Sequence, residues 1–72
     1  MSEFGKITRI ELNKTGIVVN YDGHHARSSV LVQRISADTI KVTAIGTGLT
    51  INLSPVNGHL YTEYSNLLRS NL

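Results

Sequence analysis

Two runs of alternating residues on either side of a glycine-flanked break, from Ile40 to Leu53, most constrain what this chain can fold into. In both runs apolar residues alternate with Lys, Thr or Asn, and Gly46-Thr47-Gly48 separates the runs. A period of two places each apolar set on one face of a β-strand. Glycine supplies the positive φ angles that a tight turn needs. The pattern predicts an antiparallel hairpin with one apolar face and one polar face.

Similar alternation extends through most of the preceding chain. Asn13-Lys14-Thr15-Gly16 is typical of a turn, with Gly16 able to take the left-handed conformation. Val30, Leu31 and Val32 are consecutive apolar residues, which is typical of a strand covered on both faces. Together these patterns predict five strands, near residues 6–13, 16–22, 29–35, 39–45 and 48–54.

The periodicity changes after Pro55, which lacks the N–H that a strand ladder requires. Apolar residues then recur at i, i+4, i+7 and i+8, the spacing of one stripe on an α-helix. The residues of this stripe are Leu60, Tyr64, Leu67 and Leu68. We therefore expect an amphipathic C-terminal helix near residues 59–70.

Five short strands and one helix predict a mainly β fold. Two architectures fit: a small five-stranded antiparallel barrel of the SH3-like or Sm-like type, and a curved sheet with the helix packed on it. Residues 1–5 are expected to form a flexible lead-in, and residues 6–72 a single domain. A chain of 72 residues without cysteine cannot reinforce its small core with disulfides. We therefore expect a homo-oligomer, formed through the free edges of the sheet.

The charge balance permits a polyanionic partner without requiring one. Seven Lys and Arg residues against five acidic residues give a net charge of +2. No apolar run is long enough to span a membrane, and the N-terminus lacks the pattern of a secretory signal. These features and the absence of cysteine predict a cytoplasmic protein with no membrane partner.

The chain contains no recognisable motif for catalysis or cofactor binding. Gly46-Thr47-Gly48 lies between two predicted strands, whereas a phosphate-binding glycine loop leads from a strand into a helix. A nucleophile elbow and paired catalytic carboxylates are also missing from the sequence. His24 and His25 are adjacent, so on an extended chain their side chains point to opposite sides and cannot easily bind one ion. We expect a protein that is not an enzyme and has neither a cofactor nor a metal.

The leading prediction is a small regulatory protein that binds RNA or single-stranded DNA through phosphate contacts on a basic β surface. Lys41 shares the polar face of the hairpin with Thr43, Thr50 and Asn52, whose hydroxyl and amide groups can assist. Ordinary solubilising charge explains the basic residues equally well. The candidate nucleic-acid contacts are Arg9, His24, His25, Arg27, Arg34 and Lys41.

The alternative prediction is a protein-binding module, such as an inhibitor, adaptor or assembly subunit of a larger protein target. Such a module would use a sheet edge and the helix. Val30 and Tyr61 are the candidate interface anchors, because aliphatic and aromatic side chains dominate the centres of interfaces. Tyr21 and Tyr64 follow the apolar patterns of their segments and are expected in the core.

Overall fold

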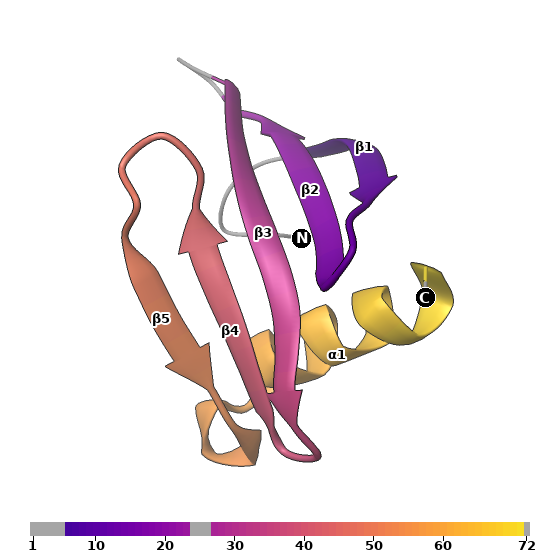
Figure 1. Cartoon of the computed structure of the whole chain (residues 1–72), viewed down its shortest axis with the longest axis vertical. Helices are drawn as coiled ribbons and strands as arrows, with labels where there is room; N and C mark the ends of the chain where they lie inside the picture. The colour runs from indigo at the N-terminus through magenta and orange to yellow at the C-terminus, as the bar shows by residue number, and fades with distance from the viewer. Residues whose placement is uncertain (1–5, 24–26, 72) are drawn as a thin grey trace.

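The computed structural model describes residues 6–23 and 27–71 of the 72-residue chain (Figure 1). It contains one five-stranded antiparallel sheet in which each strand pairs with the next along the chain. The elements are β1 (Lys6–Leu12), β2 (Gly16–Asp22), β3 (Arg27–Ser36), β4 (Thr39–Ala44), β5 (Thr50–Leu53), the 3-10 turn η1 (Pro55–Asn57) and the helix α1 (His59–Asn71).

The mainly β prediction is confirmed, and each predicted element lies within two residues of its observed bounds. The sheet is not closed: β1 and β5 each pair with one strand only and form its two edges, on opposite sides of Figure 1. The architecture is thus a curved, open sheet with a helix on one side.

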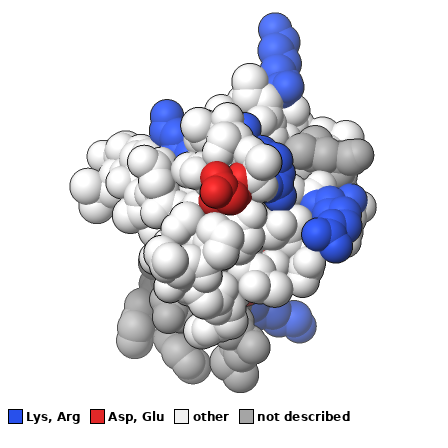
Figure 2. All heavy atoms as spheres, turned by 90° about the horizontal axis from the view of Figure 1, so that it is seen from below, with Lys and Arg blue, Asp and Glu red and all other residues white. Residues whose placement is uncertain are grey.

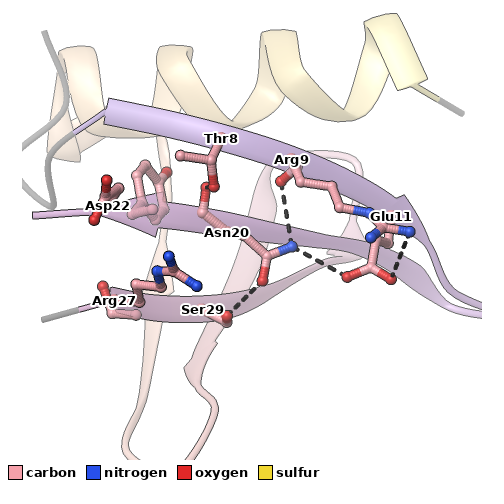
Figure 3. Close-up of a pocket in the computed structure, with 9 residues that line it drawn as sticks. Thr8, Arg9, Glu11, Asn20, Asp22, Arg27 and Ser29 are labelled. Atoms are coloured by element: carbon pink, nitrogen blue, oxygen red, sulfur yellow. Dashed lines mark hydrogen bonds and ion pairs between the residues drawn. The ribbon is translucent and has the colours of Figure 1, made fainter.

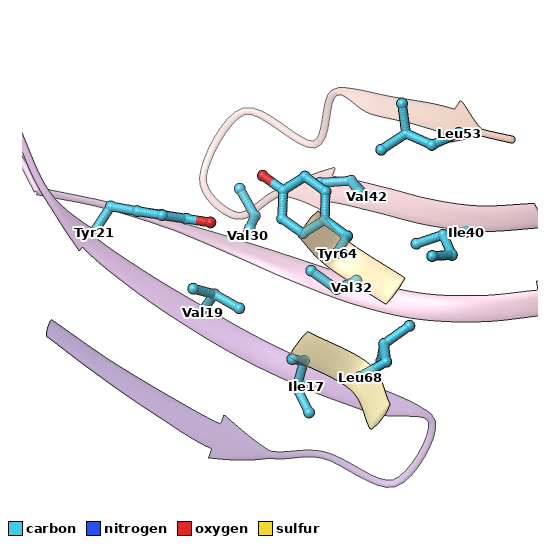
Figure 4. Close-up of a cluster of buried hydrophobic side chains, with 10 residues drawn as sticks. All are labelled: Ile17, Val19, Tyr21, Val30, Val32, Ile40, Val42, Leu53, Tyr64 and Leu68. Atoms are coloured by element: carbon cyan, nitrogen blue, oxygen red, sulfur yellow. The ribbon is translucent and has the colours of Figure 1, made fainter. Parts of the chain in front are cut away.

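Alternation divides the sheet into two faces. The inner face packs against α1, which crosses behind β2, β3 and β4 in Figure 1. Tyr64 and Leu68 come from α1 and meet the apolar side chains of the sheet (Figure 4), as the helical stripe predicts. The buried sheet residues are Ile17, Val19, Tyr21, Val30, Val32, Ile40, Val42 and Leu53.

The outer face is the side of the sheet that points away from α1, and no element of the described chain covers it. Leu31 lies on this face between Val18 and Thr43 and is half-buried among its neighbours. Within the described chain, the strand around Val30–Val32 is therefore covered by another element on one face only.

The close approach of β2 to β3 explains the glycine at the start of β2. A Cβ atom at Gly16 would lie 2.0 Å from the carbonyl oxygen of Val32. Positive φ angles occur instead at Gly46, Gly48 and Gly58. Gly16 is thus required by lack of space and not by the left-handed conformation predicted for it, whereas the two glycines of the β4–β5 turn have the expected geometry.

Candidate nucleic-acid interface

Strand register gathers basic side chains on the outer face. Lys6 of β1 and Arg27 of β3 both pair with Asp22 of β2, so these three residues form one row across the sheet. Arg9 lies in the next row, and Lys41 of β4 lies near the other end of the face, opposite Gln33. Four of the seven Lys and Arg residues thus lie on this face, together with two carboxylates.

Asn20 connects the first three strands on this face (Figure 3). Its side-chain amide donates to the carbonyl oxygen of Arg9 at 3.3 Å and to Glu11 Oε2 at 3.1 Å. Its Oδ1 accepts a 2.6 Å hydrogen bond from the hydroxyl of Ser29. Arg9 Nη2 also lies 3.8 Å from Glu11 Oε1. These bonds fix the positions of polar groups that would otherwise sample several rotamers.

An open hollow of about 520 Å³ lies over this network. Arg9 and Arg27 line it together with Asn20, Ser28 and Ser29, so cationic, amide and hydroxyl groups face the same space. Glu11 and Asp22 also line it and offset the two guanidinium charges. The hollow therefore offers hydrogen-bond donors without a strong local positive charge.

The second half of the outer face is polar and carries Lys41. This residue pairs with Gln33 on one side and Asn52 on the other. Thr50 Oγ1 donates to Thr43 Oγ1 at 3.3 Å. The predicted grouping of Lys41 with Thr43, Thr50 and Asn52 on one face is confirmed.

Arg34 is not on the outer face with the other predicted cations. A register shift between Arg34 and Ser36 interrupts β3, and Arg34 pairs with the buried Ile40 of the inner face. Its Nη2 donates to Ser65 Oγ of α1 at 3.0 Å, and its Nη1 donates to the carbonyl oxygen of Ala37 at 3.2 Å. The guanidinium joins the sheet to the helix, so the structure places Arg34 apart from the cations of the outer face, and its predicted contact with nucleic acid stays a prediction.

The two predicted interface anchors, Val30 and Tyr61, belong to the core or pack against it. Val30 is only 2% exposed and belongs to the core, so it is not a surface anchor of the described chain. Tyr61 is half-buried on α1 and packs against the core cluster. His24 and His25 lie outside the described residues.

Sequence reasoning missed Lys6, Asn20 and Ser29 as parts of this surface. The signal for Asn20 and Ser29 was present in the alternation of the second and third strands, which places both residues opposite the buried set. Lys6 was hidden by a register shift between Ile7 and Arg9. Strict alternation would place Lys6 and Arg9 on different faces, whereas the bulge brings them to the same one.

Figure 2 shows separate basic side chains on the lower end of the molecule, with mostly uncharged surface and an acidic side chain between them. Within residues 6–23 and 27–71, no group of three or more His, Asp or Glu side chains is arranged to hold a metal ion. The helices of this described part are too short or too polar to cross a membrane.

Comparison with known proteins gives no further assignment of this surface. No protein-family model matches the chain, and searches of the curated proteins and of the solved structures found no match to it.

Proposed function

We propose that this chain is a small, non-enzymatic, cytoplasmic regulatory module that binds RNA or single-stranded DNA through its outer face. The observation that supports this function most directly is the placement of Lys6, Arg9, Arg27 and Lys41 on one uncovered sheet face. Opposite charge attracts the phosphate backbone, and phosphate contacts supply most of the sequence-independent affinity for nucleic acids.

The spacing of the cations suits contacts with successive phosphates of one nucleic-acid chain. Neighbouring β-strands lie about 4.8 Å apart, so residues in the same row on β1 and β3 are separated by about 10 Å. Lys6 and Arg27 occupy such a row, with Asp22 between them. Lys41 extends the basic positions to β4. A chain of phosphates crossing the sheet would meet cations on several strands.

Recognition on this face would rely on phosphates and not on base stacking. Tyr21 and Tyr64 are buried in the core, and Tyr61 packs against the same core from α1. The described part of the outer face therefore carries no tyrosine on which a base could stack. Stacking contributes about 1–3 kcal/mol per base in single-strand binders, so we expect moderate affinity with little sequence preference.

The direct test is a fluorescence-anisotropy titration of labelled single-stranded RNA and DNA oligonucleotides of mixed sequence over a range of salt concentrations. If all four cations of one protein copy contact phosphates, log K for oligonucleotide binding should decrease with log[salt] with a slope of about −3. Each phosphate contact to a single-stranded nucleic acid contributes about −0.7 to this slope. Absence of binding at low salt, or binding that salt does not weaken, would contradict the proposal.

Charge-matched variants locate the binding surface. Arg27→Ala and Lys41→Ala should each weaken binding and make the salt slope less steep by about 0.7. Arg69→Ala is the control, because it removes the same charge from an exposed position in the last turn of α1. Equal effects of all three substitutions would indicate a response to net charge alone and would contradict a site on the outer face.

If both oligonucleotides fail to bind at low salt, the protein-binding alternative becomes the better proposal. The observation that favours it is a group of exposed apolar side chains near β5, including Leu49 and Ile51. An interface of that kind would persist at moderate salt, because burial of apolar surface does not depend on charge attraction.

A further inference from the structure

The two edges of the sheet differ in how well they are protected against pairing with another strand. The β1 edge carries Lys6, Arg9 and Glu11 and is interrupted by the register shift after Ile7. Charged residues and bulges are the usual means by which proteins block edge pairing. β5 (Thr50–Leu53) has no charged residue and pairs with β4 without a register shift. β5 is therefore the edge that is open to a further strand.

Exposed apolar side chains are concentrated around this edge. Six large hydrophobic residues are exposed in the described chain, and four of them lie within residues 45–56. Exposed apolar side chains beside a free strand edge favour association with another chain. The four residues and their exposed fractions are Ile45 (52%), Leu49 (72%), Ile51 (52%) and Val56 (92%).

The hydrogen-bond pattern shows which backbone groups of β5 face outward. The N–H of Ala44 donates to the carbonyl oxygen of Leu49 at 2.7 Å. Hydrogen-bonded and non-hydrogen-bonded pairs alternate along an antiparallel ladder. The backbone groups of Leu49, Ile51 and Leu53 therefore point towards β4. Those of Thr50 and Asn52 point towards the free edge.

We propose that β5 pairs with β5 of a second copy of this chain about a two-fold axis that passes beside Ile51. In this antiparallel register Ile51 lies opposite the partner's Ile51, and Thr50 lies opposite the partner's Asn52. The two Thr–Asn pairs exchange four backbone hydrogen bonds. The two sheets become one continuous ten-stranded sheet with both helices on the same side.

The structure selects this register over its neighbours. A slip of one residue would place apolar side chains of one copy on the polar face of the other. A slip of two residues keeps a single hydrogen-bonded pair, Thr50 with the partner's Thr50 or Asn52 with the partner's Asn52, and would need backbone groups of Gly48 or Ser54 for the other hydrogen bonds. The N–H of Gly48 already donates to the carbonyl oxygen of Ala44 at 2.9 Å, and the N–H of Ser54 donates to Asn57 Oδ1 at 2.8 Å.

A second copy suits this edge because the edge is its own complement. β5 is uncharged, so two copies meet without like-charge repulsion. Leu49 would face the partner's Leu53 on the inner side, and the polar side chains would pair on the outer side. The pairing would also cover apolar surface that α1 leaves exposed at Ile51. This inference does not depend on the proposed nucleic-acid binding.

The first test measures mass by light scattering during size exclusion over a series of concentrations. The wild-type chain should approach twice its mass of 7.9 kDa, and Ile51→Lys should be monomeric because it places two positive charges against each other. Leu12→Lys is the matched control, since Leu12 is 71% exposed on β1, and it should remain dimeric. A monomeric wild type, or a dimer that Ile51→Lys leaves intact or that Leu12→Lys also abolishes, would overturn the proposal.

The second test determines the register by cross-linking and does not require a variant that dissociates. The chain has no cysteine, so one introduced thiol reports on one position. Opposed Cα atoms in a non-hydrogen-bonded pair lie about 4.5 Å apart, within disulfide range. Ile51→Cys should therefore form a disulfide-linked dimer under mild oxidation. Thr50→Cys should not, because diagonal neighbours are about 7–8 Å apart; the reverse result would overturn the assigned register.

Discussion

At some positions of this sheet, contacts with neighbouring strands explain which residue type is present. Gly16 is the clearest case, because a Cβ atom there would meet the backbone of β3, and backbone cannot move aside as a flexible side chain can. Asn20 is the second case, since one amide group contacts β1 and β3 from the middle of β2. Both residues also belong to types that are depleted in strands, so their presence in β2 reflects these contacts.

Replacement of Gly16 by alanine should destabilise the fold. The added methyl group would lie 2.0 Å from the carbonyl oxygen of Val32, so β2 and β3 would have to separate locally. We expect the free energy of unfolding to fall by about 2 kcal/mol, the usual cost of overpacking, as measured by urea denaturation. Lys14→Ala in the adjacent turn is the control and should change it by less than about 0.5 kcal/mol. Equal stability of Gly16→Ala and wild type would show that the strands can separate freely.

Asn20→Asp tests the outer face by replacing one side-chain amide nitrogen with a carboxylate oxygen. The substitution removes the donor to Glu11 and places a second carboxylate where the amide was 3.1 Å from Glu11 Oε2. We expect lower stability and weaker oligonucleotide binding, because like charges repel each other and repel phosphates. Asn66→Asp adds the same charge at an exposed position of α1 and should leave binding nearly unchanged. Indistinguishable affinities of the two variants would argue against binding on the outer face.

The helix α1 is attached to the sheet by a polar contact as well as by its apolar stripe. Arg34 reaches across from the end of β3 to Ser65, which is buried on α1. The same guanidinium also donates to the β3–β4 turn at Ala37. One side chain thus couples the position of the helix to the hairpin that precedes it.

A double-mutant cycle of Arg34→Ala and Ser65→Ala should detect this coupling. Each single substitution is expected to lower the free energy of unfolding, and the coupling energy should be about 1 kcal/mol, as for a hydrogen bond with partial access to water. The measurement is urea denaturation of the four proteins. Additive effects within about 0.3 kcal/mol would mean that the contact does not join the two elements energetically.

The positions of the elements could be predicted from the sequence because alternation and the helical stripe extend over whole segments. The faces of β1 could not, because a register shift after Ile7 breaks the period of two. A bulge adds one residue and moves every later side chain to the opposite face. The direction of Arg34 follows from alternation, because Arg34 has the same parity as the buried Val30 and Val32; its charge suggested an outer position instead. The predicted surface role of Val30 is wrong although alternation was informative there: Val30 has the same parity as Val32, and both are buried on the inner face.

The two proposed surfaces use different parts of the sheet and share only Thr50 and Asn52 of β5. Nucleic-acid contacts use the outer face of the sheet, whereas pairing of copies uses the edge at β5. Pairing would join two outer faces into one, with Lys41 of each copy one strand away from the junction. A dimer would therefore present twice the number of cations on a single continuous surface.

This geometry predicts that loss of pairing changes the salt dependence of binding. A long single-stranded oligonucleotide that crosses both copies should show a slope of log K against log[salt] about twice as steep for the wild type as for Ile51→Lys, because the number of phosphate contacts doubles. A short oligonucleotide that spans one copy should give similar slopes for both proteins. Anisotropy titrations with both lengths distinguish the outcomes. A steep slope that Ile51→Lys preserves on the long oligonucleotide would show that one outer face is sufficient, whatever the oligomeric state.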